Sequence, residues 1–170
     1  MNVDQRTTRL PAGVSDQPDS FPRRAVQRLT RGPGALKSPV ARWAINVLAV
    51  VGAGLMVWAG VIHLQLWSEG YRSIAVIGPL FLVQGIASIA LALALVVLRR
   101  VFLLVAGAVL MVGTAVGLLL SVTVGLFGYQ ESLAITDAAT SLTVEFIGAA
   151  LLAGAAAVLA AGPQSRLARH

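Results

Sequence analysis

The sequence predicts an all-α membrane protein, a four-transmembrane-helix bundle preceded by a disordered basic N-terminal tail. Its composition is 57% hydrophobic and only 12% charged, whereas a soluble domain is nearer half apolar and a quarter charged. Four apolar runs each exceed the roughly 20 residues that a helix needs to cross the hydrocarbon core of a bilayer. These runs are continuous rather than alternating, which excludes the strands of a membrane β-barrel.

The transmembrane domain is expected over residues 41–162, between a basic tail at 1–40 and a short basic tail at 163–170. The four helices are expected at about 43–67, 74–98, 101–127 and 138–161. Little more than Arg99 and Arg100 separates the second run from the third. These two helices must therefore form a tight antiparallel hairpin.

The N-terminal tail is polar and rich in proline, with too few apolar residues to offset the entropy of folding, so disorder is predicted through residue 40. No apolar stretch follows Met1, so the segment is not a cleaved signal peptide. One interpretation is that the tail rests on anionic lipid headgroups, where each cation contributes about 1 kcal/mol. The alternative is a solvated tail that only fixes the topology.

The distribution of cations predicts the orientation. Eight lysines and arginines precede the first run, Arg99 and Arg100 follow the second, and Arg166 and Arg169 follow the fourth, whereas the other two loops hold only Arg72. The positive-inside rule then places both termini in the cytoplasm. We therefore expect a multi-pass protein of the plasma membrane whose loops near residues 70 and 130 face outward.

Small residues recur every four positions in three of the predicted helices, a pattern typical of faces where membrane helices pack closely. The three sets are Gly113, Gly117, Ser121 and Gly125; Ser141, Glu145, Ala149, Ala153, Ala157 and Ala161; and Gln84, Ser88 and Ala92. They predict a compact bundle and offer faces for homo- or hetero-oligomers.

Three polar side chains inside the runs are candidates for a site. Glu145 must turn inward, because an ionised carboxylate in lipid costs several kcal/mol. It either ties helices together or serves a proton, a cation or a ligand. Four roles are open to His63: it ligates a metal, relays a proton, pairs with Glu145 or hydrogen-bonds an outer loop. Gln84 is the type of residue that hydrogen-bonds between helices.

At 1.5 Å of rise per residue, His63, Glu145 and Gln84 fall about 6, 10 and 15 Å from the outer helix ends. The sequence therefore predicts an outer-half polar pocket among the first, second and fourth helices. Its predicted rim consists of Trp67, Glu69, Tyr71, Arg72, Glu131 and Asp137. Both outer loops also contain a Gly-Tyr pair, at Gly70-Tyr71 and Gly128-Tyr129, which is a faint internal repeat.

Two segments, GVIHLQLWSEGYRSIAVIGPLFLVQ at 60–84 and GLFGYQES at 125–132, resemble a group of small, uncharacterised four-helix membrane proteins of actinobacteria. The layout is also similar to DoxX-like proteins, in topology only. The resemblance implies no activity. It implies an outer-face cluster formed by His63, Trp67, Gly70-Tyr71-Arg72, Gly78-Pro79, Gln84, 125–131 and Glu145.

The absence of cysteine excludes disulfides and thiolate metal sites, and no phosphate loop, zinc-protease or hydrolase motif is present. No catalytic, cofactor-binding or metal-ligating residue is therefore predicted. The net charge of +6 lies outside the apolar runs, so no nucleic-acid partner is expected. The first interpretation is a non-enzymatic membrane accessory or interaction protein. The alternatives are a small transporter or binding site for a proton, cation or lipophilic ligand, and a membrane redox component.

Overall fold

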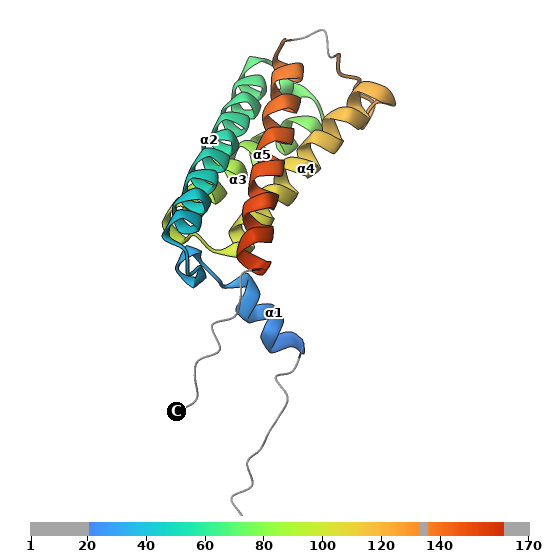
Figure 1. The fold of residues 1–170 in the computed structure, drawn as a ribbon. Coiled ribbons are helices and arrows are strands. Elements are labelled where there is room, and N and C mark those ends of the chain that lie inside the picture. The colour runs from blue at the N-terminus through green and yellow to red at the C-terminus, as the bar shows by residue number, and fades with distance from the viewer. Residues whose placement is uncertain (1–20, 133–135, 162–170) are drawn as a thin grey trace, which may run out of the picture.

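The computed structural model describes residues 21–132 and 136–161. Within them the chain forms α1 (Phe21–Leu29), the 3-10 turn η1 (Pro33–Ala35), α2 (Pro39–Glu69), the 3-10 turn η2 (Tyr71–Ser73), α3 (Ile77–Leu98), α4 (Val101–Thr123) and α5 (Thr136–Ala161). Four of the described helices, α2 to α5, are long and apolar enough to cross a membrane. The all-α four-helix prediction is confirmed (Figure 1).

The ends of the long helices follow from backbone chemistry. Ser38 caps α2 by accepting a hydrogen bond from the amide of Ala41, and Pro39 occupies the first turn, where its missing N–H is harmless. Helix α4, the third of the four predicted spans, ends at Thr123 and not at the predicted residue 127. The reason is that Gly125 and Gly128 adopt positive φ and turn the chain back, with paired backbone hydrogen bonds between Leu126 and Tyr129.

The long helices pack unequally. α2 packs closely against α3 and α5, and α4 packs closely against α5, whereas α3 and α4 meet over a much shorter length. In Figure 1, α4 leans away from its neighbours toward the end that carries the α2–α3 and α4–α5 connections. We call this end the loop end, and the opposite one, where Arg99 and Arg100 join α3 to α4, the hairpin end.

The core lies in the middle of the bundle and toward the hairpin end. Its largest fully buried apolar side chains come from all four long helices: Met56, Leu95, Leu104, Met111, Leu152 and Leu159. The predicted small-residue faces explain only part of this packing. Ser141, Glu145 and Ala149 are buried, but Ala153, Ala157 and Ala161 are exposed. A spacing of four drifts by about 40° per step on a helix of 3.6 residues per turn, so the row leaves the buried face.

The segment before α2 differs from the predicted disorder over residues 21–40. α1 is helical, Leu36 is buried in the core, and the carbonyl of Arg31 accepts a hydrogen bond from the amide of Val101 at 2.9 Å. Arg100 Nη1 also donates to the carbonyl of Thr30 at 2.8 Å. The first bond gives a partner to an amide at the start of α4 that its own helix leaves unpaired, and the second gives one to a carbonyl just after α1. Residues 1–20 and 162–170 lie outside the described residues.

Candidate ligand-binding cavity

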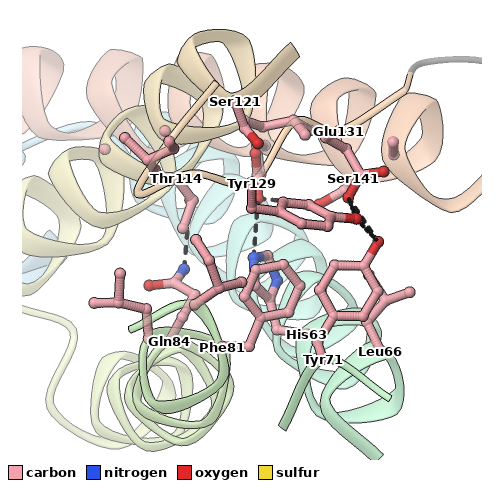
Figure 2. Close-up of a pocket in the computed structure, with 18 of the residues that line it drawn as sticks. His63, Leu66, Tyr71, Phe81, Gln84, Thr114, Ser121, Tyr129, Glu131 and Ser141 are labelled. Carbon is pink, nitrogen blue, oxygen red and sulfur yellow. Dashed lines mark hydrogen bonds and ion pairs between the residues drawn. The ribbon is translucent and has the colours of Figure 1, made fainter. Parts of the chain in front are cut away.

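A cavity of about 430 Å³ lies at the loop end, between α2, α3, α4 and α5. This volume falls in the range of roughly 300–1,000 Å³ that is usual for small-molecule sites. Its walls are mainly apolar, and in Figure 2 side chains of α2 and α3 face those of α4, α5 and the loop between them. The residues of the predicted polar pocket, His63, Gln84 and Glu145, all line this one cavity.

The cavity exists because α4 carries glycine where its neighbours have separated. Gly113 and Gly117 both line the cavity, and a Cβ added at either would meet no atom within 4 Å. By contrast, a Cβ at Gly107 of the same helix would lie 2.9 Å from the sulfur of Met56. The prediction that Gly113 and Gly117 form a packed helix face is therefore wrong. Glycines of α4 therefore pack closely at one level of the bundle and border open space at another, where the helix leans away from its neighbours (Figure 1).

Glu145 is the most deeply buried polar group of the cavity. Only 1% of its surface is exposed. Its Oε1 accepts a hydrogen bond of 3.1 Å from the hydroxyl of Ser141, one helical turn earlier. Its Oε2 is also buried and has no hydrogen-bond partner among the described residues. The hydroxyl of Thr114 lies close to the carboxyl group, but it donates to carbonyls of its own helix. One oxygen of the carboxyl group is thus hydrogen-bonded, the other is buried without a partner, and the residue belongs to the wall of the cavity.

His63 lies beside Glu145. Its Nδ1 is 2.8 Å from the carbonyl of Ala59, and because a carbonyl oxygen only accepts, Nδ1 must carry a proton. The other ring nitrogen, Nε2, is 3.9 Å from Glu145 Oε1. The pairing with Glu145 is therefore the alternative that the geometry supports, and the hydrogen bond to an outer loop is replaced by one within α2.

Gln84 joins two helices and also lines the cavity. Its amide nitrogen donates to Ser88 Oγ at 3.1 Å and to Thr114 Oγ1 at 3.4 Å, which links α3 to α4. This is the helix-to-helix role expected for it. Thr114 was not predicted as a site residue, because a threonine that bonds its own helix is ordinary in a membrane span. It does so here too, donating to the carbonyls of Leu110 and Met111.

A hydrogen-bonded triad, which consists of Tyr71, Tyr129 and Glu131 and which we call the mouth triad, lines the cavity beside the helix connections. The hydroxyl of Tyr71 donates to Glu131 Oε2 at 2.6 Å, and that of Tyr129 lies 3.0 Å from the Tyr71 oxygen and 3.2 Å from Glu131 Oε2. The ring of Tyr71 also stacks on Phe81, with centroids 4.9 Å apart. In Figure 2, Tyr129 and Glu131 face Tyr71, which lies beside His63 and Phe81.

Burial and the triad change the acidity of the two tyrosines. Burial first, and then the hydrogen bonds to Glu131 and Tyr129, raise the pKa of Tyr71 far above its ordinary value of 10.0. Burial and the charge of Glu131 also raise the pKa of Tyr129, although its hydrogen bond to Tyr71 acts in the opposite direction. The predicted pocket and its rim did not include Tyr129, although the cluster implied by the resemblance covered residues 125–131. The repeated Gly-Tyr pair of the two loops is the signal that could have found it.

The rest of the predicted rim is placed differently. Trp67, Glu69 and Arg72 do not line the cavity. Glu69 is exposed and accepts a hydrogen bond from Gln65, and Arg72 forms no hydrogen bond or ion pair with a described residue. The side chain of Asp137 lies outside the described part of the chain. Within residues 21–132 and 136–161, no three histidine, cysteine or acidic side chains gather to hold a metal ion.

The fold and its four long apolar helices define a multi-pass membrane protein. No family model, curated protein or solved structure that was compared with the chain matches it. The resemblance to small actinobacterial membrane proteins stays a prediction.

Proposed function

We propose that this membrane protein binds a small lipophilic molecule in the cavity at its loop end, without catalysing a reaction. The observation that carries the proposal is the unpartnered Oε2 of Glu145, buried in the wall of a mainly apolar cavity. Leaving a buried polar atom without a hydrogen bond costs about 1–3 kcal/mol. A bound molecule that supplied the missing partner would offset this cost.

The same observation sets a binding protein apart from an accessory protein that only packs its helices. An accessory protein would be more stable with an apolar residue at position 145 and with α4 packed along its glycines. Instead, Gly113 and Gly117 leave space for a ligand, and Glu145 places a polar group in the wall of that space. Both features lower stability in the empty bundle, and both have a use when the cavity is filled.

The proposal includes the orientation that the cations predict. With both termini in the cytoplasm, the loop end and its cavity face the outer leaflet of the plasma membrane. α1 then lies near the inner surface. There its exposed Val26 and Leu29 and the nearby Arg23 and Arg28 suit the boundary between anionic headgroups and acyl chains.

Photolabelling of the full chain in lipid nanodiscs tests the binding function. The probe is a short alkyl diazirine that carries a hydroxyl group. Mass spectrometry of the labelled peptides should place the label on cavity residues of α3 and α4. Gly117→Leu fills the cavity and should abolish this labelling.

Gly54→Leu is the matched control. Gly54 is exposed on α2, and a Cβ there also meets nothing within 4 Å, so the same enlargement is made away from the cavity. Labelling should survive in this variant. Equal labelling of the cavity peptides in wild type and Gly117→Leu would overturn the proposal.

A further inference from the structure

The hydrogen-bonding groups that face the cavity are unequally distributed between donors and acceptors. Ser141 donates to Glu145, Thr114 donates to carbonyls of its own helix, and the amide nitrogen of Gln84 donates to Ser88 and Thr114. The hydroxyls of the mouth triad donate within the triad. Apart from Ser121, whose hydroxyl can donate or accept, the donors of these lining groups are therefore already used.

The groups left open are acceptors. They are Glu145 Oε2, which is buried without a partner, and Gln84 Oε1, which takes no hydrogen bond from a described residue. His63 does not change this balance. In its neutral form Nε2 is an acceptor, and when protonated it points its hydrogen at Glu145 Oε1. A guest that satisfies the cavity must therefore bring hydrogen-bond donors.

The charged residues that line the cavity also favour a ligand that brings hydrogen-bond donors. Two carboxyl groups line the cavity, Glu145 at its floor and Glu131 at its mouth, and no lysine or arginine is among the described residues that line it. A neutral donor such as a hydroxyl would satisfy Oε2 but would add no positive charge. An ammonium group would supply both a hydrogen-bond donor and a positive charge. Hydrogen bonds between charged groups are about twice as strong as neutral ones.

Aromatic rings complete the environment. Phe81 lies between His63 and Tyr71, with ring centroids 5.0 and 4.9 Å away, and Tyr129 meets Tyr71 edge to face. Phe81, Tyr71 and Tyr129 all line the cavity. The face of an aromatic ring attracts a cation, and the attraction strengthens where water is excluded.

We propose, on the basis of the binding function above, that the guest is a lipophilic amine whose ammonium group donates to Glu145 Oε2. Its apolar body lies along the open glycine face of α4. From there an apolar groove between α3 and α4, which shares Val109 and Leu110 with the cavity, continues toward the hydrocarbon. A chain attached to the amine has room in this groove.

Three probes with the same alkyl diazirine body and different head groups test the class of ligand. The heads are an ammonium, a hydroxyl and a carboxylate, and the full chain is held in nanodiscs of zwitterionic lipid so that the membrane itself does not concentrate the amine. In the wild type, the ammonium probe should label the cavity at a concentration about tenfold lower than the hydroxyl probe. The carboxylate probe should label it least.

Variants then assign the preference to one residue. Glu145→Gln should remove the advantage of the ammonium probe while the hydroxyl probe still labels. Glu69→Gln, which removes an exposed acid of the loop end that does not line the cavity, should change nothing. Equal labelling of the wild type by the ammonium and hydroxyl probes would overturn the amine proposal and leave the binding function standing. Cavity labelling by none of the probes would overturn both.

Discussion

Gly60 of α2 and Gly85 of α3 bring two helix backbones into contact. A Cβ on Gly60 would lie 2.9 Å from the carbonyl oxygen of Gly85, and a Cβ on Gly85 would lie 3.0 Å from that of Gly60. Membrane helices gain stability from such close approach, because lipid provides little hydrophobic force to draw them together. This contact holds α3 against α2 just beside the cavity, while α4 stands apart.

The effect of a glycine substitution on stability should therefore depend on the surroundings of that glycine, as a comparison of Gly85 with Gly117 shows. Gly85→Ala forces a methyl group against Leu64 and the α2 backbone and should lower the free energy of unfolding by about 1–3 kcal/mol. Gly117→Ala adds the same methyl group in open space and should leave stability unchanged or raise it by about 0.5–1 kcal/mol. Denaturant titration of the purified protein in detergent, followed by circular dichroism, measures both. Equal losses would mean that α4 is packed at Gly117.

Glu145→Leu should separate stability from binding. Because Oε2 has no partner, replacing the carboxyl group with an apolar side chain of similar size should leave the free energy of unfolding unchanged or raise it by up to about 3 kcal/mol. Labelling of the cavity by the ammonium probe should be lost. Leu152→Ala, at a fully buried core position, is the destabilising reference and should cost about 2–5 kcal/mol. A large loss of stability in Glu145→Leu would instead make Glu145 a structural tie.

The two tyrosines of the chain should ionise at unusually high pH. Both belong to the mouth triad, so the tyrosinate absorbance of the folded protein should appear above pH 10, later than in the denatured protein. Since folding raises the pKa of Tyr71, the stability that this group contributes is complete below about pH 10 and declines as the pH rises further. Glu131→Gln removes the charge and should move the titration toward lower pH, whereas Glu69→Gln should not. An unshifted titration in Glu131→Gln would argue against the triad.

Leu36 should contribute to stability although it lies in the segment expected to be disordered. It is 8% exposed and packs in the core, so Leu36→Ala should cost about 2–5 kcal/mol. Leu29, on α1, is 43% exposed, and the same substitution there should change little. Thermal unfolding measures the melting temperatures of the two variants, and Leu36→Ala should have the lower one. Identical melting temperatures would support disorder of the segment before α2 in solution.

The orientation can be tested in a chain that has no cysteine of its own. Single cysteines at Gln130, in the α4–α5 loop, and at Gly34, before α2, occupy exposed positions. A maleimide that does not cross membranes should label Gln130→Cys in intact cells and Gly34→Cys only after lysis. Labelling in the reverse order would place the cavity on the cytoplasmic side.

The number, type and approximate position of the long helices could be predicted because each depends on local chemistry. A continuous apolar run must satisfy its backbone hydrogen bonds within itself, and only a helix does so. The inward direction of Glu145 follows from the same reasoning. The end of α4 at Thr123 was missed because an apolar stretch such as residues 124–127 does not reveal that Gly125 and Gly128 turn the chain.

The sequence by itself determined that this is a membrane bundle of four helices with His63, Gln84 and Glu145 at similar depth. Only the tertiary structure decided that these residues share one cavity, that Tyr129 lines it and that Arg72 does not. The physical reason is helix tilt. A glycine of α4 packs against Met56 at position 107 but borders open space at position 117, because the separation of the helices depends on contacts between distant segments.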